Sequence, residues 1–474
     1  MTAPIIVWFR RDLRLGDNPA LMTACELQQP VIPVFVLDEV FEQLGAAPKW
    51  RLGLALNYFG ERLEQEGSRL VLRRGKALLE LLALAAETGA RQIFWSRAYD
   101  PDSITRDTEV KTILSSKDIE ARSFGSHLLF EPWAVATKNG GFYGVYSPFW
   151  RAVKDREVRS TLDKPPAIPS PISWPTSCKL DDWEMGKSMH RGATVVRPYV
   201  NLGEYAARER LSRFMREGIE NYRNDRNRLD LSGTSGLSEN LALGEISPHT
   251  CWHAGVKAMG AGSGGAETFL KELVWREFAY HLMYHTPHIL TKNWKSNWDA
   301  FPWNCERNES VRAWEQGRTG VPLVDAAMRE MYITGRMHNR GRMMVASFLT
   351  KHLLSHWKLG LDWFEQCLID WDPASNAMGW QWTAGCGPDA APYFRIFNPE
   401  KQLETYDPSN RYVQLWLAEG SYLPSESALS YFRAIPRSWQ MHPDDPYPTA
   451  IVSSAEGRKR ALDAFSTRVQ KPDD

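Results

Sequence analysis

Several classes of protein are excluded by what this sequence lacks. Its six cysteines are scattered over 474 residues without a CxxC pair, which argues against a disulfide framework, a zinc site or an iron–sulfur cluster. No stretch approaches the roughly 18 uninterrupted apolar residues that span a bilayer, and the first residues do not read as a signal peptide. We therefore expect a cytoplasmic protein with no membrane or metal partner, whose cysteines are reduced and mostly buried.

Net charge is also absent, because 57 Lys and Arg residues balance 57 Asp and Glu residues. A polyanion such as nucleic acid would therefore have to be met by a local basic patch. Tryptophan, by contrast, is abundant: seven of the 20 residues lie before residue 200 and thirteen after it. The second half of the chain thus uses many large flat rings.

The first 125 residues predict an α/β domain. Buried strands are indicated at 5–9, 31–37, 69–73 and 92–95, with helices at 50–67 and 77–89. This alternation predicts a doubly wound parallel sheet with right-handed crossovers. No GxGxxG motif follows the first strand, so a nicotinamide-type dinucleotide fold is not supported.

The rest of the chain changes character twice. Pro- and Ser-rich text over 131–195 indicates a long interdomain linker. Later helical patterns follow one another at 203–217, 267–285, 322–334, 338–357 and 361–369. We expect an α/β domain over 1–130, the linker over 131–195, and an all-α domain over 196–474 that ends in a short polar tail.

A hydroxyl-rich loop precedes one helical pattern. The stretch "SGTSGLSENLALG" places Thr234, Ser235, Gly236 and Ser238 there. Free amides at a helix N-terminus, with hydroxyls and a glycine for close approach, suit a phosphate or pyrophosphate. An ordinary serine N-cap is the alternative, and the loop alone favours it.

The pattern at 267–282 puts Glu272, Trp275 and Arg276 on one edge of a helix. A carboxylate beside an indole can hydrogen-bond the edge of a polar ring while the indole packs on its face. A surface salt bridge with a half-buried tryptophan explains the same spacing equally well.

The stretch "GRMHNRGRMMVASF" begins a helix with Arg336, Asn339, Arg340 and Met343 along one side and Arg342 on another. Such residues suit a groove that reads phosphates and a base. A solvated basic face with a methionine in the core is the alternative.

The segment at 368–382 embeds Asp370, Asp372 and Asn376 in apolar text. The spacing argues against calcium there, because Ala374 and Ser375 occupy positions where an EF-hand needs an oxygen ligand and a glycine. Together, the loop, the aromatic faces, the arginines and the carboxylates suggest a large aromatic cofactor with phosphates, next to a nucleobase ligand.

Six ordered motifs resemble the photolyase and cryptochrome family, and most closely its bacterial members that repair cyclobutane pyrimidine dimers. The resemblance covers nearly the whole chain, in the stretches 7–21, 233–238, 275–278, 324–330, 337–343 and 389–399. It implies an N-terminal α/β domain for a light-harvesting antenna and a helical domain that binds FAD.

The resemblance also implies site residues. Asp372 would accept from the flavin ring, and Asn376 would face its N5. The implied FAD contacts are Tyr222, Thr234, Ser235, Gly236, Leu237, Ser238, Arg276, Asn339, Arg342, Asp370, Trp371, Asp372 and Asn376. The implied contacts to ultraviolet-damaged DNA are Arg226, Glu272, Trp275, Asn339, Arg340, Met343, Trp382 and Arg395.

The mechanism implied by the resemblance is light-driven electron transfer from reduced FAD to the dimer, with Glu272 stabilising the negative charge. Photolyases are among the enzymes that flip their target base out of the stack. An electron relay would run from Trp380 through Trp357 to Trp303 at the surface, and Trp363 or Trp371 could offer another branch.

Two related functions compete with this one. Cryptochrome-type blue-light sensors typically carry Asp in place of Asn376, lose Trp382 and extend into a long tail. Asn does not readily donate a proton, which favours the enzyme. Repair of the (6-4) photoproduct is the other possibility, although its iron–sulfur members need four matched cysteines.

The antenna is expected near residues 96–107, where Ser103 stands in place of the glutamate that binds folate in related proteins. Methenyltetrahydrofolate is the first expectation and a deazaflavin the second. We expect the protein to be a monomer.

Overall fold

A five-stranded parallel sheet forms the core of the N-terminal part, as predicted. The computed structural model of the chain describes residues 2–390 and 394–467. The strand order is β3-β2-β1-β4-β5, which is doubly wound about β1. The strands are β1 (Ile5–Phe9), β2 (Val31–Leu37), β3 (Val71–Arg74), β4 (Gln92–Ser96) and β5 (Glu120–Phe124).

Helices cover both faces of this sheet. Alternate residues of β1 point to opposite faces: Val7 packs in one apolar cluster with α1 (Pro19–Glu26) and α3 (Ala46–Gln65). Trp8 packs in another with α4 (Ala77–Thr88) and α5 (Pro101–Ser115). A short helix, α2 (Glu39–Glu42), follows β2. Burial on both faces explains why β1 and β2 are apolar throughout.

Strand β5 was not predicted from the sequence. Its sequence, EARSF, is exposed or half-exposed at every residue, because β5 is the edge of the sheet. It pairs in parallel register with β4, from Gln92 opposite Glu120 to Ser96 opposite Phe124. Charged residues on an edge strand discourage pairing with other chains, and they also remove the apolar signal by which strands are recognised.

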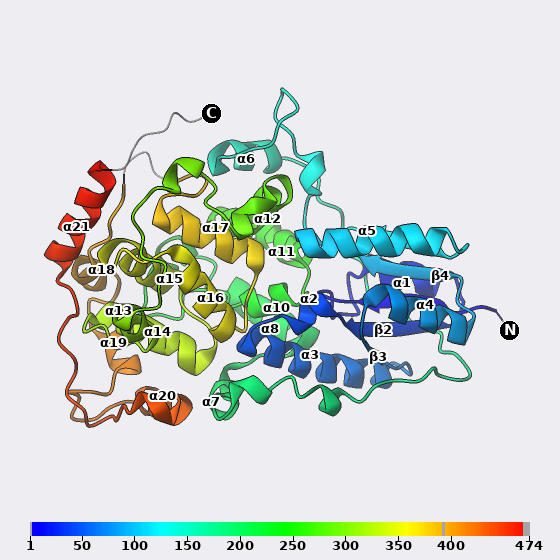
Figure 1. Cartoon of the computed structure of the whole chain (residues 1–474). Coiled ribbons are helices and arrows are strands. Elements are labelled where there is room, and N and C mark those ends of the chain that lie inside the picture. Colours follow the sequence, from blue (N-terminus) through cyan, green and yellow to red (C-terminus); the bar gives the residue numbers. More distant parts are fainter. Residues whose placement is uncertain (1, 391–393, 468–474) are drawn as a thin grey trace.

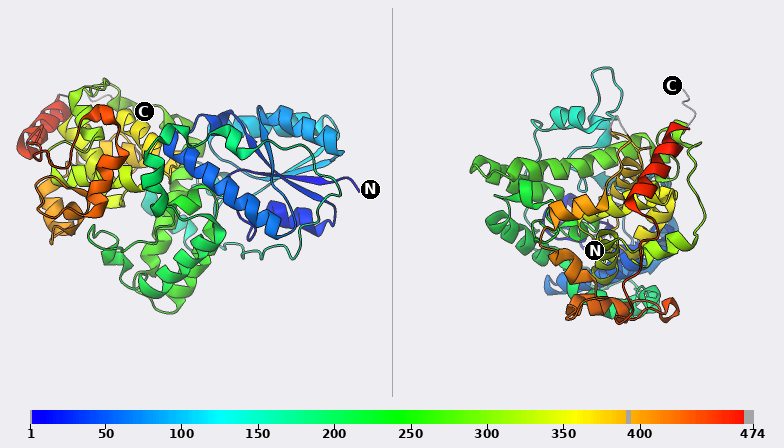
Figure 2. Two further views of the ribbon diagram at one scale, coloured as in Figure 1. Left: turned by 90° about the horizontal axis from the view of Figure 1, so that it is seen from below. Right: turned by 90° about the vertical axis from the view of Figure 1, so that its left-hand side faces the viewer.

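The segment 131–195 follows the outside of the molecule and returns past the sheet (Figure 2). Backbone hydrogen bonds tie it there, from Val31 N–H to the Pro169 carbonyl (2.6 Å) and from Cys178 N–H to the Leu72 carbonyl (2.8 Å). The segment contains η1 (Pro132–Ala134), α6 (Tyr146–Val153), η2 (Leu180–Trp183), η3 (Lys187–Met189) and α7 (Gly192–Val196). The exact domain boundaries stay a prediction.

The second half is helical, and Figure 1 shows it packed on one side of the sheet domain. Its elements are η4 (Arg197–Tyr199), α8 (Gly203–Glu217), α9 (Tyr222–Asp225), α10 (Ser238–Ala242), α11 (Pro248–Gly260), α12 (Ala266–His285), η5 (Pro287–Leu290), η6 (Ser296–Trp298), α13 (Glu309–Glu315), α14 (Pro322–Thr334), α15 (Asn339–Ser347), η7 (Phe348–His352), α16 (Trp357–Cys367), α17 (Pro373–Ala384), α18 (Pro399–Tyr406), α19 (Arg411–Trp416), α20 (Glu426–Ala434), η8 (Arg437–Trp439) and α21 (Ser454–Ser466).

The prediction of one continuous helix over 338–357 was wrong. Helix α15 ends at Ser347 and runs into the π-helix η7. The chain then turns at Leu354, whose φ of 49° is left-handed and incompatible with a continuing helix. His356 begins α16 by accepting a hydrogen bond from the backbone of Lys358. The apolar spacing continues through this break, which is why periodicity alone missed it; α16 accordingly starts earlier than the predicted 361–369.

All six cysteines are free thiols. Cys25, Cys251 and Cys386 are buried, Cys367 is half-buried, and Cys178 and Cys305 are exposed, so the expectation of mostly buried thiols holds for half of them. No helix of the described residues combines the length and apolar character needed to cross a membrane.

Candidate functional site

A cavity of about 640 Å³ lies among α9, α10, α12, α15 and α17, within the size range of cofactor sites. Most of the site residues inferred from the sequence meet there. They are Tyr222, Arg226, Thr234, Ser235, Gly236, Leu237, Ser238, Glu272, Trp275, Arg276, Asn339, Arg340, Arg342, Met343, Asp370, Asp372, Asn376, Trp380 and Trp382.

Sequence reasoning missed other lining residues: Asn227, Leu241, Ala242, Phe269, Leu273, Met337, His338, Ala346, Phe364, Ser375, Met378, Gly379 and Thr383. Several stand one helical turn from a predicted residue, as Phe269 does from Glu272, so extending each motif by helical spacing would have found them. Gly379 has open space where a side chain would be, which leaves room in the cavity beside α17.

The hydroxyl-rich loop does not act as an ordinary serine N-cap. Helix α10 has only five residues, and its N-cap is Leu237, which makes no side-chain capping bond. Gly236, with a φ of 63°, turns the chain in the left-handed region, and its carbonyl accepts from Arg210. Thr234 and Ser235 line the cavity, so their hydroxyls are placed to meet an anionic group there.

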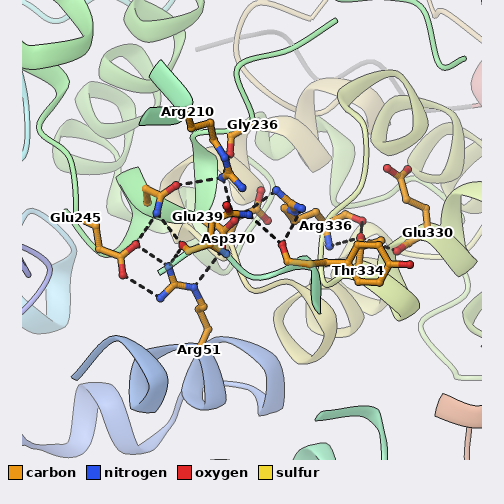
Figure 3. Close-up of polar contacts among 12 residues, drawn as sticks. Arg51, Arg210, Gly236, Glu239, Glu245, Glu330, Thr334, Arg336 and Asp370 are labelled. Carbon is orange, nitrogen blue, oxygen red and sulfur yellow. Dashed lines mark hydrogen bonds and ion pairs between the residues drawn. The ribbon is translucent and has the colours of Figure 1, made fainter. Parts of the chain in front are cut away.

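Buried ion pairs fix the helix that follows this hydroxyl-rich loop (Figure 3). Glu239, the second residue of α10, forms ion pairs with Arg51 (3.1 Å), Arg210 (3.0 Å) and Arg336 (3.3 Å). Arg51 comes from α3 of the sheet domain and also pairs with Glu245 at 2.6 Å. The loop is thus positioned by both halves of the chain.

On α12, Glu272 forms an ion pair with Arg226 at 2.7 Å on the cavity wall. Burial raises the pKa of Glu272, although Arg226 opposes the shift. Trp275 stacks on Tyr146 with ring centroids 3.6 Å apart and planes within 5°, so Tyr146 covers one face of the indole. The ion pair and the half-buried tryptophan that were the alternative explanation of this spacing are both present. Because both line the cavity, they are also placed to contact a ligand.

Four buried N–H groups in the cavity wall lack a hydrogen-bond partner among the described residues: the Nε atoms of Arg226 and Arg340, Nε2 of His338 and the indole Nε1 of Trp380. Buried donors are normally paired, so these groups fit a ligand that brings acceptor oxygens. The other end of Arg340 is anchored, because its Nη2 donates to Asn227 at 2.5 Å and its guanidinium lies over the Tyr406 ring.

Polar groups at the start of α17 are fixed in place. One oxygen of Asp372 accepts from Ser375 N–H (2.7 Å) and the other from the Tyr280 hydroxyl (2.5 Å). The amide nitrogen of Asn376 donates to the Asp372 carbonyl at 2.9 Å. Asp370 pairs with Arg342 at 2.7 Å. These groups fit a heterocyclic ring that offers N–H donors.

Tryptophans continue from the cavity into the core. Trp380 lines the cavity and packs against Phe364 with ring centroids 4.9 Å apart. His356 lies between Trp357 (5.4 Å) and Trp303 (5.3 Å). The placement of Trp303 at the surface was wrong.

Trp303 is only 7% exposed, because two aromatic neighbours cover it. Its ring stacks on Trp298 at 5.5 Å, and Phe301 lies 4.7 Å away. Whether Trp303 ends a relay stays a prediction.

Trp371 and Arg395 are not among the cavity-lining residues. Trp371 is buried nearby, and the carbonyl of Arg395 accepts from the buried Lys351 at 3.2 Å. Arg395 follows residues 391–393, the part of the 389–399 motif that lies outside the described residues. Trp363 packs away from the cavity, with ring centroids 6.4 Å from Trp439.

A doubly wound domain joined to a helical domain with a large polar and aromatic cavity defines a class of two-domain cofactor-binding proteins. A family model described as the FAD binding domain of DNA photolyase matches residues 269–467, and one described as DNA photolyase matches residues 5–170. The chain belongs to the photolyase and cryptochrome family, as its motifs indicated, and contains that family's FAD-binding domain.

Relatives and solved structures agree with this assignment. A deoxyribodipyrimidine photo-lyase of Agrobacterium fabrum is 42% identical over 471 residues, 98% of both chains. Cryptochrome-1 of Arabidopsis thaliana is 33% identical over 97% of this chain and 70% of its own length. The crystal structure of a bacterial class III photolyase from Agrobacterium tumefaciens matches with a TM-score of 0.89 at 41% identity, over 98% of each chain.

Proposed function

We propose that this protein is a deoxyribodipyrimidine photo-lyase, which splits cyclobutane pyrimidine dimers in DNA by light-driven electron transfer from reduced FAD. The observation that carries the proposal is that one cavity, of about 640 Å³, brings the predicted groups together. Its wall combines a hydroxyl-rich phosphate loop, fixed carboxylates for a heterocycle, and a Glu–Trp edge with unpaired arginine donors. A relative that is 42% identical over nearly the whole chain carries this enzyme's name.

The residues present fit FAD. The loop of Thr234, Ser235 and Ser238 would hold the pyrophosphate, and Asp372 and Asn376 would hold the ring. When bound and reduced, FAD supplies the electron after absorbing light. The side chain of Asn376 has a fixed orientation in the cavity wall, because its amide nitrogen donates a hydrogen bond to the Asp372 carbonyl. A ring bound beside it would therefore meet one defined arrangement of polar groups.

The flipped dimer would occupy the part of the cavity bounded by Glu272, Trp275 and Trp382. Glu272 would hydrogen-bond a thymine edge and, in the protonated form that burial favours, would donate to the oxygen where negative charge develops, while the two indoles pack against the lesion. Arg226 and Arg340, whose Nε groups are unpaired, would contact phosphates around it. This local basic patch supplies what a chain with no net charge otherwise lacks.

Asn376 also bears on the choice between enzyme and photoreceptor. A carboxamide does not release a proton in the physiological range, so this position does not protonate a neighbouring ring. Cryptochromes are among the relatives, but Asn376 and Trp382 together support repair of a bound lesion. The enzyme would act as a cytoplasmic monomer on ultraviolet-damaged DNA.

The antenna would occupy a second groove, of about 420 Å³, beside α5. Trp95, Trp133 and Tyr284 supply aromatic faces, and Arg97 and Lys111 supply cations that suit the glutamate carboxylates of methenyltetrahydrofolate.

The space lined by Ser103 is much smaller, about 30 Å³. Arg106 helps to close this small space through ion pairs with Asp38 (2.6 Å) and Asp107 (2.9 Å). The larger groove beside α5 is therefore the better site for an antenna, and its cations favour a folate over a deazaflavin. Extraction and chromatography of the bound chromophore would identify it, and Lys111→Ala should lower the occupancy of a folate.

The test of the main proposal is the loss of cyclobutane dimers from an ultraviolet-irradiated oligothymidine mixed with chemically reduced protein, under blue light and in darkness. Light-dependent loss is expected. A matched reaction with Glu272→Gln should be slower, because an amide is a weaker hydrogen-bond donor than a carboxyl group and does not form the ion pair with Arg226. No loss, with FAD bound and reduced, would overturn the proposal and favour a photoreceptor or the (6-4) lesion.

A further inference from the structure

Tyr280 stands behind the cavity wall and contacts the carboxylate that faces the proposed flavin. It is buried, at 3% exposed, and lies on α12 one turn after Arg276. Its hydroxyl is 2.5 Å from Oδ2 of Asp372 and 2.8 Å from Nε2 of His127. Asp372 lines the cavity, whereas Tyr280 is not among the lining residues.

The surroundings decide where the single hydroxyl proton goes. Nη2 of Arg276 lies 2.7 Å from His127 Nε2. Because a guanidinium can only donate, His127 Nε2 accepts this hydrogen bond. Burial, with Arg276 adding to the effect, lowers the pKa of His127 well below its usual value, so the imidazole is neutral. Burial likewise raises the pKa of Tyr280 well above its usual value. The protonated hydroxyl therefore donates to Asp372, the acceptor that carries charge.

Each carboxylate oxygen of Asp372 therefore accepts one hydrogen bond from the protein. Ser375 N–H holds Oδ1 at 2.7 Å, and the Tyr280 hydroxyl holds Oδ2 at 2.5 Å. Two donors on different oxygens fix the plane of the carboxyl group. The remaining lone pairs stay free for a ligand in the cavity.

We propose that Tyr280 is a positioning residue that holds Asp372 as an oriented carboxylate beside the flavin. Arg276 lies over the Tyr280 ring at 5.0 Å and occupies the His127 acceptor that would otherwise compete for the Tyr280 proton. The inference rests on the proposed function, because it takes FAD to be the ligand that Asp372 faces. A carboxylate next to the ring disfavours added negative charge, so Tyr280 sets the reduction potential of the bound flavin through Asp372.

The test is a double-mutant cycle read out as the midpoint potential of bound FAD, titrated with dithionite. Tyr280→Phe keeps the ring and removes only the donor. We expect its potential to shift to more negative values, because the carboxylate charge of Asp372 then loses one of its two hydrogen-bond donors and is less compensated beside the ring. In an Asp372→Asn background, Tyr280→Phe should cause no further shift.

Tyr447→Phe is the matched control, because its hydroxyl donates to the buried Asp325 at 2.6 Å outside the cavity. It should leave the potential unchanged. A Tyr280→Phe shift that persists in the Asp372→Asn background, or no shift at all, would overturn the inference.

Two further outcomes separate this inference from the proposed function. Protein that binds no FAD would refute the proposed function itself. If FAD binds but its midpoint potential does not change in Asp372→Asn, Asp372 does not contact the ring. The inference about Tyr280 would then fail, although the protein would still be a flavoprotein.

If Tyr280→Phe does not fold, ring-labelled tyrosine in the native protein gives a second measurement. The infrared difference between reduced and oxidised protein should contain a tyrosine band that survives in Tyr222→Phe, which lacks the cavity-lining tyrosine. Absence of that band would also overturn the inference.

Discussion

Arg51 and Glu239 form an ion pair that joins the two halves of the chain. The Nε and Oε2 atoms are 3.1 Å apart, and both side chains are 0% exposed. Arg51 lies on α3 of the sheet domain, and Glu239 follows the loop proposed to bind pyrophosphate (Figure 3). The loop is therefore held in place by a residue 188 positions away in the sequence.

Replacing Arg51 by Met should destabilise the protein strongly. Glu239 and Glu245 would each lose a buried partner, and breaking a buried pair from one side costs about 3–5 kcal/mol. The measurement is the free energy of unfolding in urea for protein loaded with FAD.

The matched control for Arg51→Met is Arg62→Met on the same helix. Arg62 pairs with Glu66 at 3.2 Å in a partly exposed i,i+4 arrangement, which contributes only about 0.3–0.5 kcal/mol. Equal destabilisation by the two variants would mean that the buried pair contributes nothing specific.

Local sequence accounts well for the sheet and poorly for such long-range contacts. Strands β1 and β2 were predictable because burial on both faces makes every residue apolar, whereas the polar edge strand β5 gave no such signal. The cavity residues were found on short motifs and by family resemblance. Arg51 and Tyr280 escaped notice because their partners, Glu239 and Asp372, are brought to them only by the tertiary fold.

Glu277 should make stability depend on pH. Burial raises its pKa from 4.5 to about 7, even though it accepts from Leu129 N–H at 2.7 Å. Between these two pH values the folded state retains a proton that the unfolded chain has released. The free energy of unfolding therefore falls as pH rises through this window, by up to about 1.4 kcal/mol per pH unit.

The variant Glu277→Gln should lose this component of the slope, measured by urea unfolding at pH 5, 6 and 7. Glu267→Gln, at the exposed start of the same helix, should keep the wild-type slope, since its side chain is 59% exposed and forms a solvent-exposed ion pair with Lys271. Identical slopes in all three proteins would show that Glu277 is already ionised at pH 5.

Trp380→Phe should block photoreduction of oxidised flavin while leaving repair by chemically reduced enzyme intact. Trp380 is 2% exposed and lines the cavity, so it is placed to be the first donor, and phenylalanine is much harder to oxidise than an indole. Flavin absorbance under blue light measures the first effect, and dimer loss measures the second.

Trp314→Phe is the comparison for Trp380→Phe. Its ring lies 6.0 Å from that of Trp380, is fully buried, and donates to the Val345 carbonyl at 3.0 Å, but Trp314 is not a cavity-lining residue. We expect it to retain photoreduction. If Trp380→Phe photoreduces at the wild-type rate, Trp380 is not in the relay.

Arg340→Ala should weaken binding to damaged DNA and flatten its salt dependence. Each phosphate contact releases condensed counterions, so loss of one contact lowers the slope of log K against log salt by about one. Arg340 has an unpaired buried Nε and an Nη2 anchored by Asn227, a geometry that leaves part of the guanidinium free for a phosphate oxygen.

Arg216→Ala controls for the loss of one positive charge. Its side chain is 62% exposed on α8 and lies 3.7 Å from Glu217, outside the cavity. Because a distant exposed charge is screened at physiological salt, this variant should keep the wild-type slope. A slope unaltered in Arg340→Ala would mean that Arg340 touches no phosphate, and its unpaired Nε would then have to serve the bound cofactor instead.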